Sequence, residues 1–184
     1  MKRILWGITG SGDRIDEIVG IMDQVNAMEG IKLNIIISKA GEQMLRRYSL
    51  WEKIESSFRK VTREVNSNVP FVAGPLQVGH YALLVVAPLT ANSTAKIALG
   101  IADTLVTNAV AQTLKGNTPV LLYPVDQNPG TVETTAPDGM QYTIRTREVD
   151  LRNAEMLRQM EGVTVVPSPE HIFPAIKRII KVDG

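Results

Sequence analysis

Apolar residues along the chain gather into short continuous runs, and stretches with helical periodicity separate one run from the next. Such runs are typical of strands that are buried on both faces of a parallel sheet. They predict strands at 3–9, 31–37, 82–86, 119–123 and 163–166. Helical periodicity predicts helices at 14–28, 40–48, 103–115, 150–160 and 169–181. A weaker pattern over 50–69 predicts a helix at 51–59 and a short strand at 61–65.

Regular alternation of strand, turn and helix sets the fold class. Consecutive parallel strands need crossover helices, which pack on both faces of the sheet. The sequence therefore predicts an α/β fold with a doubly wound, mostly parallel sheet, a Rossmann-like and flavodoxin-like three-layer sandwich. At 184 residues the chain suits one domain, residues 1–184, with a full core.

The central apolar run ends at Ala87-Pro88, where a proline without an N–H predicts the end of the strand's hydrogen-bond ladder. The following segment, 90–94, places three hydroxyls and one amide at the start of a helix-forming stretch. A helix N-terminus offers free N–H groups and the positive end of a dipole, so it can bind an anion or a polar ring edge. The same residues also fit a simple N-cap.

Two further polar turns follow predicted strands. Gly10-Ser11-Gly12 precedes a helix, and glycines there let backbone N–H groups approach a phosphate. The turn lacks the third glycine of the dinucleotide fingerprint and the P-loop lysine, so it is a mononucleotide-type loop at most, and a plain tight turn fits equally well. Ser38 ends the second strand, where ligands gather in open α/β sheets, although a serine before a helix also serves as a cap.

Residues 125–139 break the alternation. They are rich in Asn, Pro, Gly, Thr and acidic side chains and have no apolar period, which predicts a long loop. The loop leaves the carboxyl end of a strand, so a lid or substrate clamp and a disordered surface loop are both consistent with it. Its polar candidates are Asp126, Gln127 and Tyr142, the last in an alternating, exposed or subunit-pairing strand at 141–147.

Composition removes several classes of function. The formal net charge of +1 with interspersed charges favours neither a nucleic-acid surface nor an anionic-membrane anchor. The chain has no cysteine, so it forms no disulfide, thiolate metal site, cysteine nucleophile or protein-bound iron–sulfur cluster, and we predict no metal site. No stretch has the features of a signal peptide or a membrane helix, which predicts a cytoplasmic location.

The segment Pro88–Ala98 resembles a block with the pattern Pro-Ala-Ser-Ala-Asn-Thr in the flavin-containing cysteine-decarboxylase family. That family includes phosphopantothenoylcysteine decarboxylase, the lantibiotic peptide decarboxylases, the flavin prenyltransferases and one component of dipicolinate synthase. At Ser38, 107–112 and 160–165 the chain is most similar to the archaeoflavoprotein and dihydromethanopterin reductase branch.

This resemblance implies FMN as the cofactor, and no adenine-half motif argues for FAD. The phosphate would lie on the glycine turn and Ser38, and the ribityl chain and ring edge on the helix start after Pro88. The candidate cofactor-binding residues are Gly10, Ser11, Gly12, Ser38, Thr90, Ala91, Asn92, Ser93 and Thr107.

The sequence departs from the decarboxylases at two places. Gly74 occupies the position of their catalytic histidine, and His80 lies six residues further on. Their downstream motif of proline, methionine and asparagine is replaced by 123–126, Tyr-Pro-Val-Asp. A glycine cannot move a proton, so the decarboxylation loses its candidate base. No arginine of the kind that prenyltransferases use on phosphate lies near Val125.

The resemblance implies an FMN-dependent oxidoreductase whose flavin passes electrons from a donor to an acceptor, with dihydromethanopterin as the acceptor that becomes tetrahydromethanopterin. An FMN electron-transfer flavoprotein that accepts electrons from ferredoxin is the alternative. A decarboxylase or prenyltransferase and a non-catalytic flavin-binding subunit are further rivals. Family members are homo-oligomers with the flavin near subunit contacts, which implies a homo-oligomer here.

Overall fold

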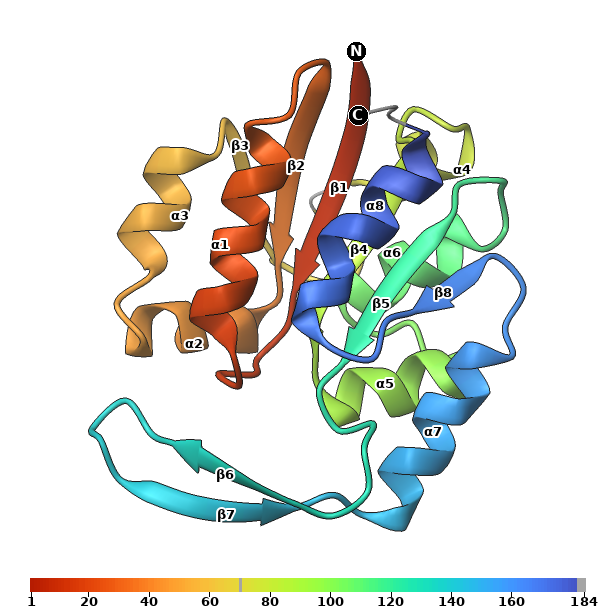
Figure 1. Cartoon of the computed structure of the whole chain (residues 1–184). Coiled ribbons are helices and arrows are strands. Elements are labelled where there is room, and N and C mark those ends of the chain that lie inside the picture. The colour runs from red at the N-terminus through yellow and green to blue at the C-terminus, as the bar shows by residue number, and fades with distance from the viewer. Residues whose placement is uncertain (70, 182–184) are drawn as a thin grey trace.

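The computed structural model describes residues 1–69 and 71–181. A six-stranded sheet lies at its centre in the order β3-β2-β1-β4-β5-β8, and every neighbouring pair is parallel (Figure 1). Its strands are β1 (Lys2–Ile8), β2 (Ile31–Ile37), β3 (Lys60–Arg63), β4 (Leu83–Leu89), β5 (Val120–Pro124) and β8 (Val163–Val165). The order runs outward in both directions from β1 and β4, which confirms the predicted doubly wound sheet.

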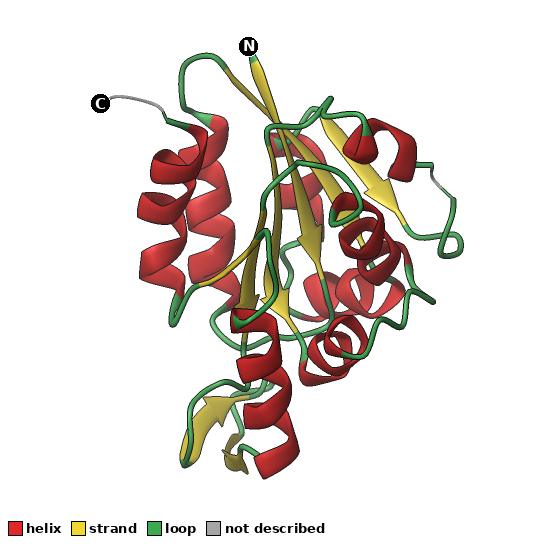
Figure 2. Cartoon of the chain, turned by 90° about the vertical axis from the view of Figure 1, so that its right-hand side faces the viewer, coloured by secondary structure: helices red, strands yellow, loops and turns green. Residues whose placement is uncertain are grey.

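Helices cover both faces of this sheet, which makes the three layers that the sequence predicts (Figure 2). One layer holds α1 (Ile15–Asn26), α2 (Lys39–Arg47), α3 (Trp51–Ser57) and α8 (Ile172–Ile180), the last preceded by a 3₁₀ turn at Pro169–His171. The other holds α4 (Ala73–Gln77), α5 (Ala91–Ala98), α6 (Leu105–Thr113) and α7 (Glu148–Arg158). None of these described helices combines the length and the apolar character that a membrane span requires.

The central strands are apolar at successive positions because both of their faces are buried. In β1, Ile4 and Trp6 pack in the core with α1 and α8, while Leu5 packs in the core with α6. Trp51 of α3 and Phe58, which follows it, are also buried in the first of these cores.

The prediction that Pro88 ends its strand is wrong. Strand β4 continues to Leu89, which pairs with Pro124 of β5 after an irregularity in the register. Proline removes only a donor: the Pro88 carbonyl still accepts the Thr9 N–H at 3.2 Å, and the Ala87 carbonyl accepts Trp6 Nε1–H at 2.7 Å. The strand therefore keeps its link to β1 through its acceptors.

Residues 125–139 are not one structureless loop, which corrects the prediction for this segment. They contain β6 (Thr131–Thr135), which pairs antiparallel with β7 (Gln141–Arg145) in a separate two-stranded hairpin sheet. Nearly all of the hairpin residues are exposed, and β6, with Val132 as its one apolar residue, lacks the apolar alternation that marks a half-buried strand. The predicted exposed strand at 141–147 is confirmed over 141–145.

Glu64 links two helix N-termini at the carboxyl end of β3. Its carboxylate accepts the Lys39 N–H at 3.0 Å, at the start of α2, and the Leu105 N–H at 2.8 Å, at the start of α6. Each helix begins with N–H groups that have no partner inside the helix, and an anion there also meets the positive end of the dipole. One side chain thus ties the two helical layers together.

Replacing Glu64 with alanine should lower the free energy of unfolding by about 2–3 kcal/mol, because two N–H groups lose a charged acceptor. Urea unfolding of Glu64→Ala beside Glu55→Ala, an exposed position on α3, measures the difference. Equal stability of the two variants would contradict the linking role.

Candidate functional site

Thr9 joins β1 and β4, the neighbouring strands between which the strand order reverses. It follows β1 and is 2% exposed; its Oγ1 donates to the Pro88 carbonyl at 2.8 Å and accepts the Thr90 N–H at 2.9 Å. The carboxyl ends of β1 and β4 are therefore held side by side at the point where open α/β sheets bind ligands. Sequence reasoning missed this residue; a hydroxyl directly after an apolar strand was the available signal.

The glycine turn at residues 10–12 presents free backbone donors beside Thr9. Ser11 N–H donates to the Thr9 carbonyl at 3.0 Å, and Ser11 Oγ accepts the Asp13 N–H at 3.2 Å. The N–H groups of Gly10 and Gly12 have no acceptor among the described residues. Both can therefore bind a ligand anion near the start of α1.

Close packing against α2 requires Gly10, while a side chain at Gly12 would displace the Tyr48 ring. A Cβ on Gly10 would lie 2.6 Å from Ala40 Cβ, and one on Gly12 would lie 2.4 Å from the Tyr48 ring. The glycines thus bring the turn against α2, in addition to exposing its N–H groups.

Ser38 lies next to this turn because its N–H donates to the Ile8 carbonyl at 3.0 Å. It is 8% exposed and is the N-cap of α2, with Oγ accepting the Gly41 N–H at 3.0 Å. Its oxygen is an acceptor in this bond, so its own proton stays available to an acceptor outside the chain. The cap role and a ligand role are therefore compatible.

Thr90 and Ser93 form the corresponding arrangement at the start of α5. Thr90 Oγ1 accepts the Ser93 N–H at 3.2 Å and donates to Ser93 Oγ at 3.1 Å. Ser93 is buried, and its proton remains for another acceptor. Ala91 and the exposed Asn92 complete the first turn, and the Ala91 N–H lies against the Asp126 carboxyl.

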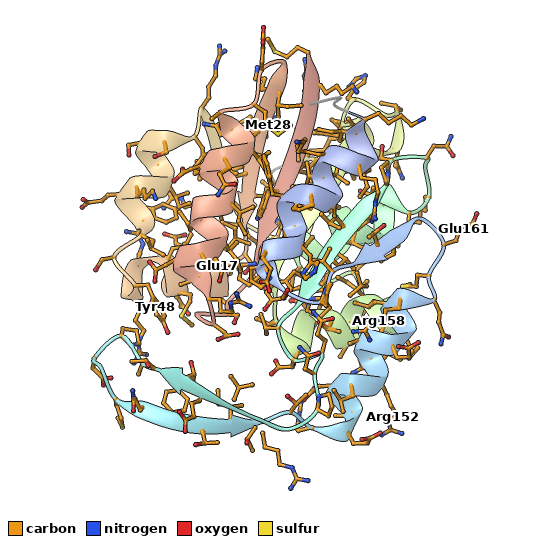
Figure 3. The ribbon with its side chains drawn as sticks, viewed as in Figure 1. Glu17, Met28, Tyr48, Arg152, Arg158 and Glu161 are labelled. Carbon is orange, nitrogen blue, oxygen red and sulfur yellow. The ribbon has the colours of Figure 1, made fainter. Side chains whose placement is uncertain are left out.

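The β6–β7 hairpin lies below the carboxyl edge of the sheet and helps to form a pocket there (Figure 1). Tyr48, at the end of α2, reaches toward it (Figure 3), and Tyr48 Oη donates to the Thr135 carbonyl at 3.4 Å. The pocket has a volume of about 110 Å³, below the roughly 300–1,000 Å³ of most small-molecule sites. Its lining comprises Ser11, Asp13, Val125 and Asp126 from the sheet edge and Val132, Thr134, Ile144 and Thr146 from the hairpin.

Tyr142, Gln127 and Thr107, all expected at the site, lie outside the pocket lining. Tyr142 pairs across the hairpin with Thr134, a pocket residue, and stays 46% exposed. Gln127 is buried: Nε2 donates to the carbonyls of Pro124 and Val166, both at 2.8 Å, and Oε1 accepts from Arg158 at 2.7 Å.

Thr107 is 1% exposed and exchanges hydrogen bonds with Thr104 in the capping box of α6. Of the predicted site residues, only Ser11 and Asp126 line this pocket; its lining contains neither Thr107 nor Gln127 nor any of the other candidates. Within residues 1–69 and 71–181, no cluster of three or more His, Asp or Glu side chains is placed to hold a metal ion.

Two carboxyls of the pocket, Asp13 and Asp126, have a raised pKa. Burial is the largest cause that raises the pKa of Asp126, and the negative charges of Asp150 and Asp13 add to it, while Arg147 opposes them. Burial likewise raises the pKa of Asp13 against the opposing charge of Arg14. Burial also raises the pKa of Tyr123 to about 12. Partial burial near the hairpin therefore raises the pKa of all three groups.

The raised pKa of Asp126 predicts a pH dependence of stability. The unfolded chain releases this proton at a lower pH than the folded chain, so the free energy of unfolding falls as pH rises from the ordinary carboxyl pKa through the folded pKa. Asp126→Asn should remove that part of the slope and be more stable than the wild type at neutral pH. Urea unfolding at several pH values, with Asp138→Asn as the matched control, tests this; identical slopes in all three proteins would contradict it.

A doubly wound sheet with a glycine turn and capped helix N-termini at its point of reversal defines an α/β protein with a site for a phosphorylated, mononucleotide-type ligand. The family model described as Flavoprotein matches residues 1–182, and the chain belongs to this family. The match confirms the resemblance to flavin-containing proteins.

Individual relatives agree with this membership. An uncharacterized protein of Methanocaldococcus jannaschii is 46% identical over 182 residues, which cover 99% of this chain and 98% of that protein. A dihydromethanopterin reductase (acceptor) of Methanosarcina mazei is 30% identical over 236 aligned positions, covering 94% of this chain and 98% of the reductase. The crystal structure of Burkholderia xenovorans DmrB in complex with FMN, described as a cubic protein cage for redox transfer, has a TM-score of 0.83 at 30% identity, covering 98% of this chain and 96% of that chain.

Proposed function

We propose that this protein binds FMN at the carboxyl edge of its sheet and acts as an FMN-dependent oxidoreductase. The observation that carries the proposal is the direction of the hydroxyl bonds. Ser11, Ser38 and Ser93 each accept a hydrogen bond from within the chain, so each keeps a proton for an external acceptor. Such donors suit the phosphate oxygens and the polar ring edge of a flavin mononucleotide.

The residues divide into two groups along the proposed ligand. Gly10, Ser11, Gly12 and Ser38 would hold the phosphate, with the two free glycine N–H groups and two hydroxyl protons as donors. The start of α5, residues 90–93, would hold the ribityl chain and the ring edge. Bound FMN supplies the hydride or electron transfer, while these residues orient it and adjust its potential through hydrogen bonds.

A second copy of the chain completes the site in this proposal. The pocket of about 110 Å³ is too small to enclose a flavin, so the chain supplies one wall. Apolar and aromatic side chains of the hairpin remain open beside it: Val132 is 47% exposed, Tyr142 46% and Ile144 43%. A neighbouring copy in a homo-oligomer would cover them, and Tyr142 and Asp126 would face the substrate.

The names of the relatives support a pterin acceptor, with dihydromethanopterin reduced to tetrahydromethanopterin. The alternative is an electron-transfer flavoprotein that takes electrons from ferredoxin. Decarboxylation is less well supported because the pocket lining contains neither histidine. His80 is exposed at the opposite edge of the sheet, and His171 Nδ1 pairs with Ser168 Oγ at 2.6 Å.

The proposal predicts a flavin absorption spectrum for the purified protein and a released cofactor with the mass of FMN. After anaerobic reduction, dihydromethanopterin should reoxidise the bound flavin. A flavin that the pterin leaves reduced but that oxidised ferredoxin reoxidises would replace the reductase with the electron carrier. A protein that stays colourless after reconstitution with FMN would contradict both.

The variant Ser38→Asp distinguishes the role of Ser38 as a helix cap from its proposed role as a phosphate ligand. Aspartate caps helices as well as serine does, so α2 should persist, but a carboxylate cannot donate to a phosphate and repels it. We expect the affinity for FMN to fall by about tenfold or more and the affinity for riboflavin, which has no phosphate, to fall less. Fluorescence titration with both flavins measures the two affinities, with Ser56→Asp, at an exposed position of α3, as the control. Equal losses for both flavins would contradict the phosphate assignment of Ser38.

A further inference from the structure

A second pocket lies at the amino edge of the sheet, away from the candidate flavin site. Its strand residues come from the amino-terminal halves of β1 and β3 and from the first four positions of β2, and its volume is about 370 Å³. Figure 1 shows this edge at the top, where β1 begins, and the hairpin at the bottom. The seven residues of β1 separate the two edges by roughly 20 Å.

Positive charge dominates this amino-edge pocket. Arg3, Lys32, Arg59 and Lys60 line it together with His80, and its described lining contains no carboxylate. Among the described residues, none of the four cations has an ion-pair partner. The charge is therefore not neutralised from within the chain.

The sheet register places two of these cations directly side by side. Arg3 of β1 pairs with Lys32 of β2, and neighbouring strands lie about 4.8 Å apart. Like charges at opposed positions destabilise a sheet, so this pair costs stability unless an anion lies between the two groups. In the next pair, Lys60 of β3 is in register with Asn34 of β2, which extends the cationic surface across three strands.

The floor of the pocket contains a buried amide that lacks one hydrogen bond. Asn34 is 5% exposed; its Nδ2 donates to Tyr81 Oη at 3.0 Å, and its Oδ1 has no partner among the described residues. Such an atom is costly to bury. Turning the amide over lets the Tyr81 hydroxyl donate to Oδ1, and Asn34 still lines the pocket.

We propose that this amino-edge pocket binds a small anion that carries phosphate groups. The volume of about 370 Å³ falls within the range of small-molecule sites. Guanidinium and ammonium donors approach from three strands, and tetrahedral phosphates accept hydrogen bonds from several directions. The recessed amide floor favours a small ligand over the flat surface of an acidic protein. The inference does not depend on FMN binding at the other edge.

Calorimetric titration of the full-length protein as purified, with its flavin where one is bound, with inorganic pyrophosphate tests the proposal. We expect one pyrophosphate per chain, an affinity that falls as salt is raised, and an unchanged absorption spectrum of the bound flavin. Citrate serves as a second multiply charged anion and should bind more weakly. Absence of pyrophosphate binding, displacement of the flavin, or equal binding of citrate would each overturn the assignment.

The double variant Arg3→Gln/Lys32→Gln should weaken pyrophosphate binding by about tenfold or more. Its melting temperature without ligand should stay equal to that of the wild type or rise, because the like-charge repulsion is removed. Arg152→Gln/Arg178→Gln carries the same change of net charge at exposed positions on α7 and α8 and is the matched control. An equal loss of affinity in the control would show that only the overall charge matters and would overturn the assignment of anion binding to this pocket.

Discussion

The structure depends on the link between β1 and β4, the two central strands between which the strand order reverses. Thr9 donates to the Pro88 carbonyl and accepts the Thr90 N–H, while Trp6 donates to the Ala87 carbonyl. These bonds use the carbonyl acceptors that remain beside the proline and bring two strand ends together. The glycine turn after β1 and the start of α5 after β4 are thereby held next to each other, which a ligand site at this edge requires.

Hydroxyl groups at the carboxyl edge of the sheet both cap helices and offer a donor to a ligand. Ser38 and Ser93 accept bonds from the chain, which stabilises helix starts and fixes their orientation, and both keep a proton for another acceptor. Below them the hairpin contributes apolar side chains to the pocket, while the sheet edge contributes two carboxyls with raised pKa, Asp13 and Asp126. The opposite edge carries unpaired cations such as Arg3 and Lys32 among the described residues. The two ends of one sheet thus present different chemistry.

Several parts of the candidate site follow from local sequence. Gly10, Ser38 and Thr90 lie at the carboxyl ends of strands, as predicted, because an apolar run followed by a polar turn marks such an end. Thr107 and Gln127 show the limit of that reasoning. Both are polar residues near strand or helix ends, yet their hydrogen bonds go to Thr104 and to the carbonyls of Pro124 and Val166. A pattern along the chain does not reveal which partner a side chain finds.

The sequence by itself determined the layered α/β architecture, since continuous apolar strands must be covered on both faces and parallel strands need crossover helices. Only the tertiary structure decided which strands pair and which side chains contact distant segments. The hairpin at 131–145 has no buried face to mark it, and Glu64 reaches two helices that are distant in sequence. The pairing of Arg3 with Lys32 likewise depends on strand register, which comes from the packing of the whole sheet.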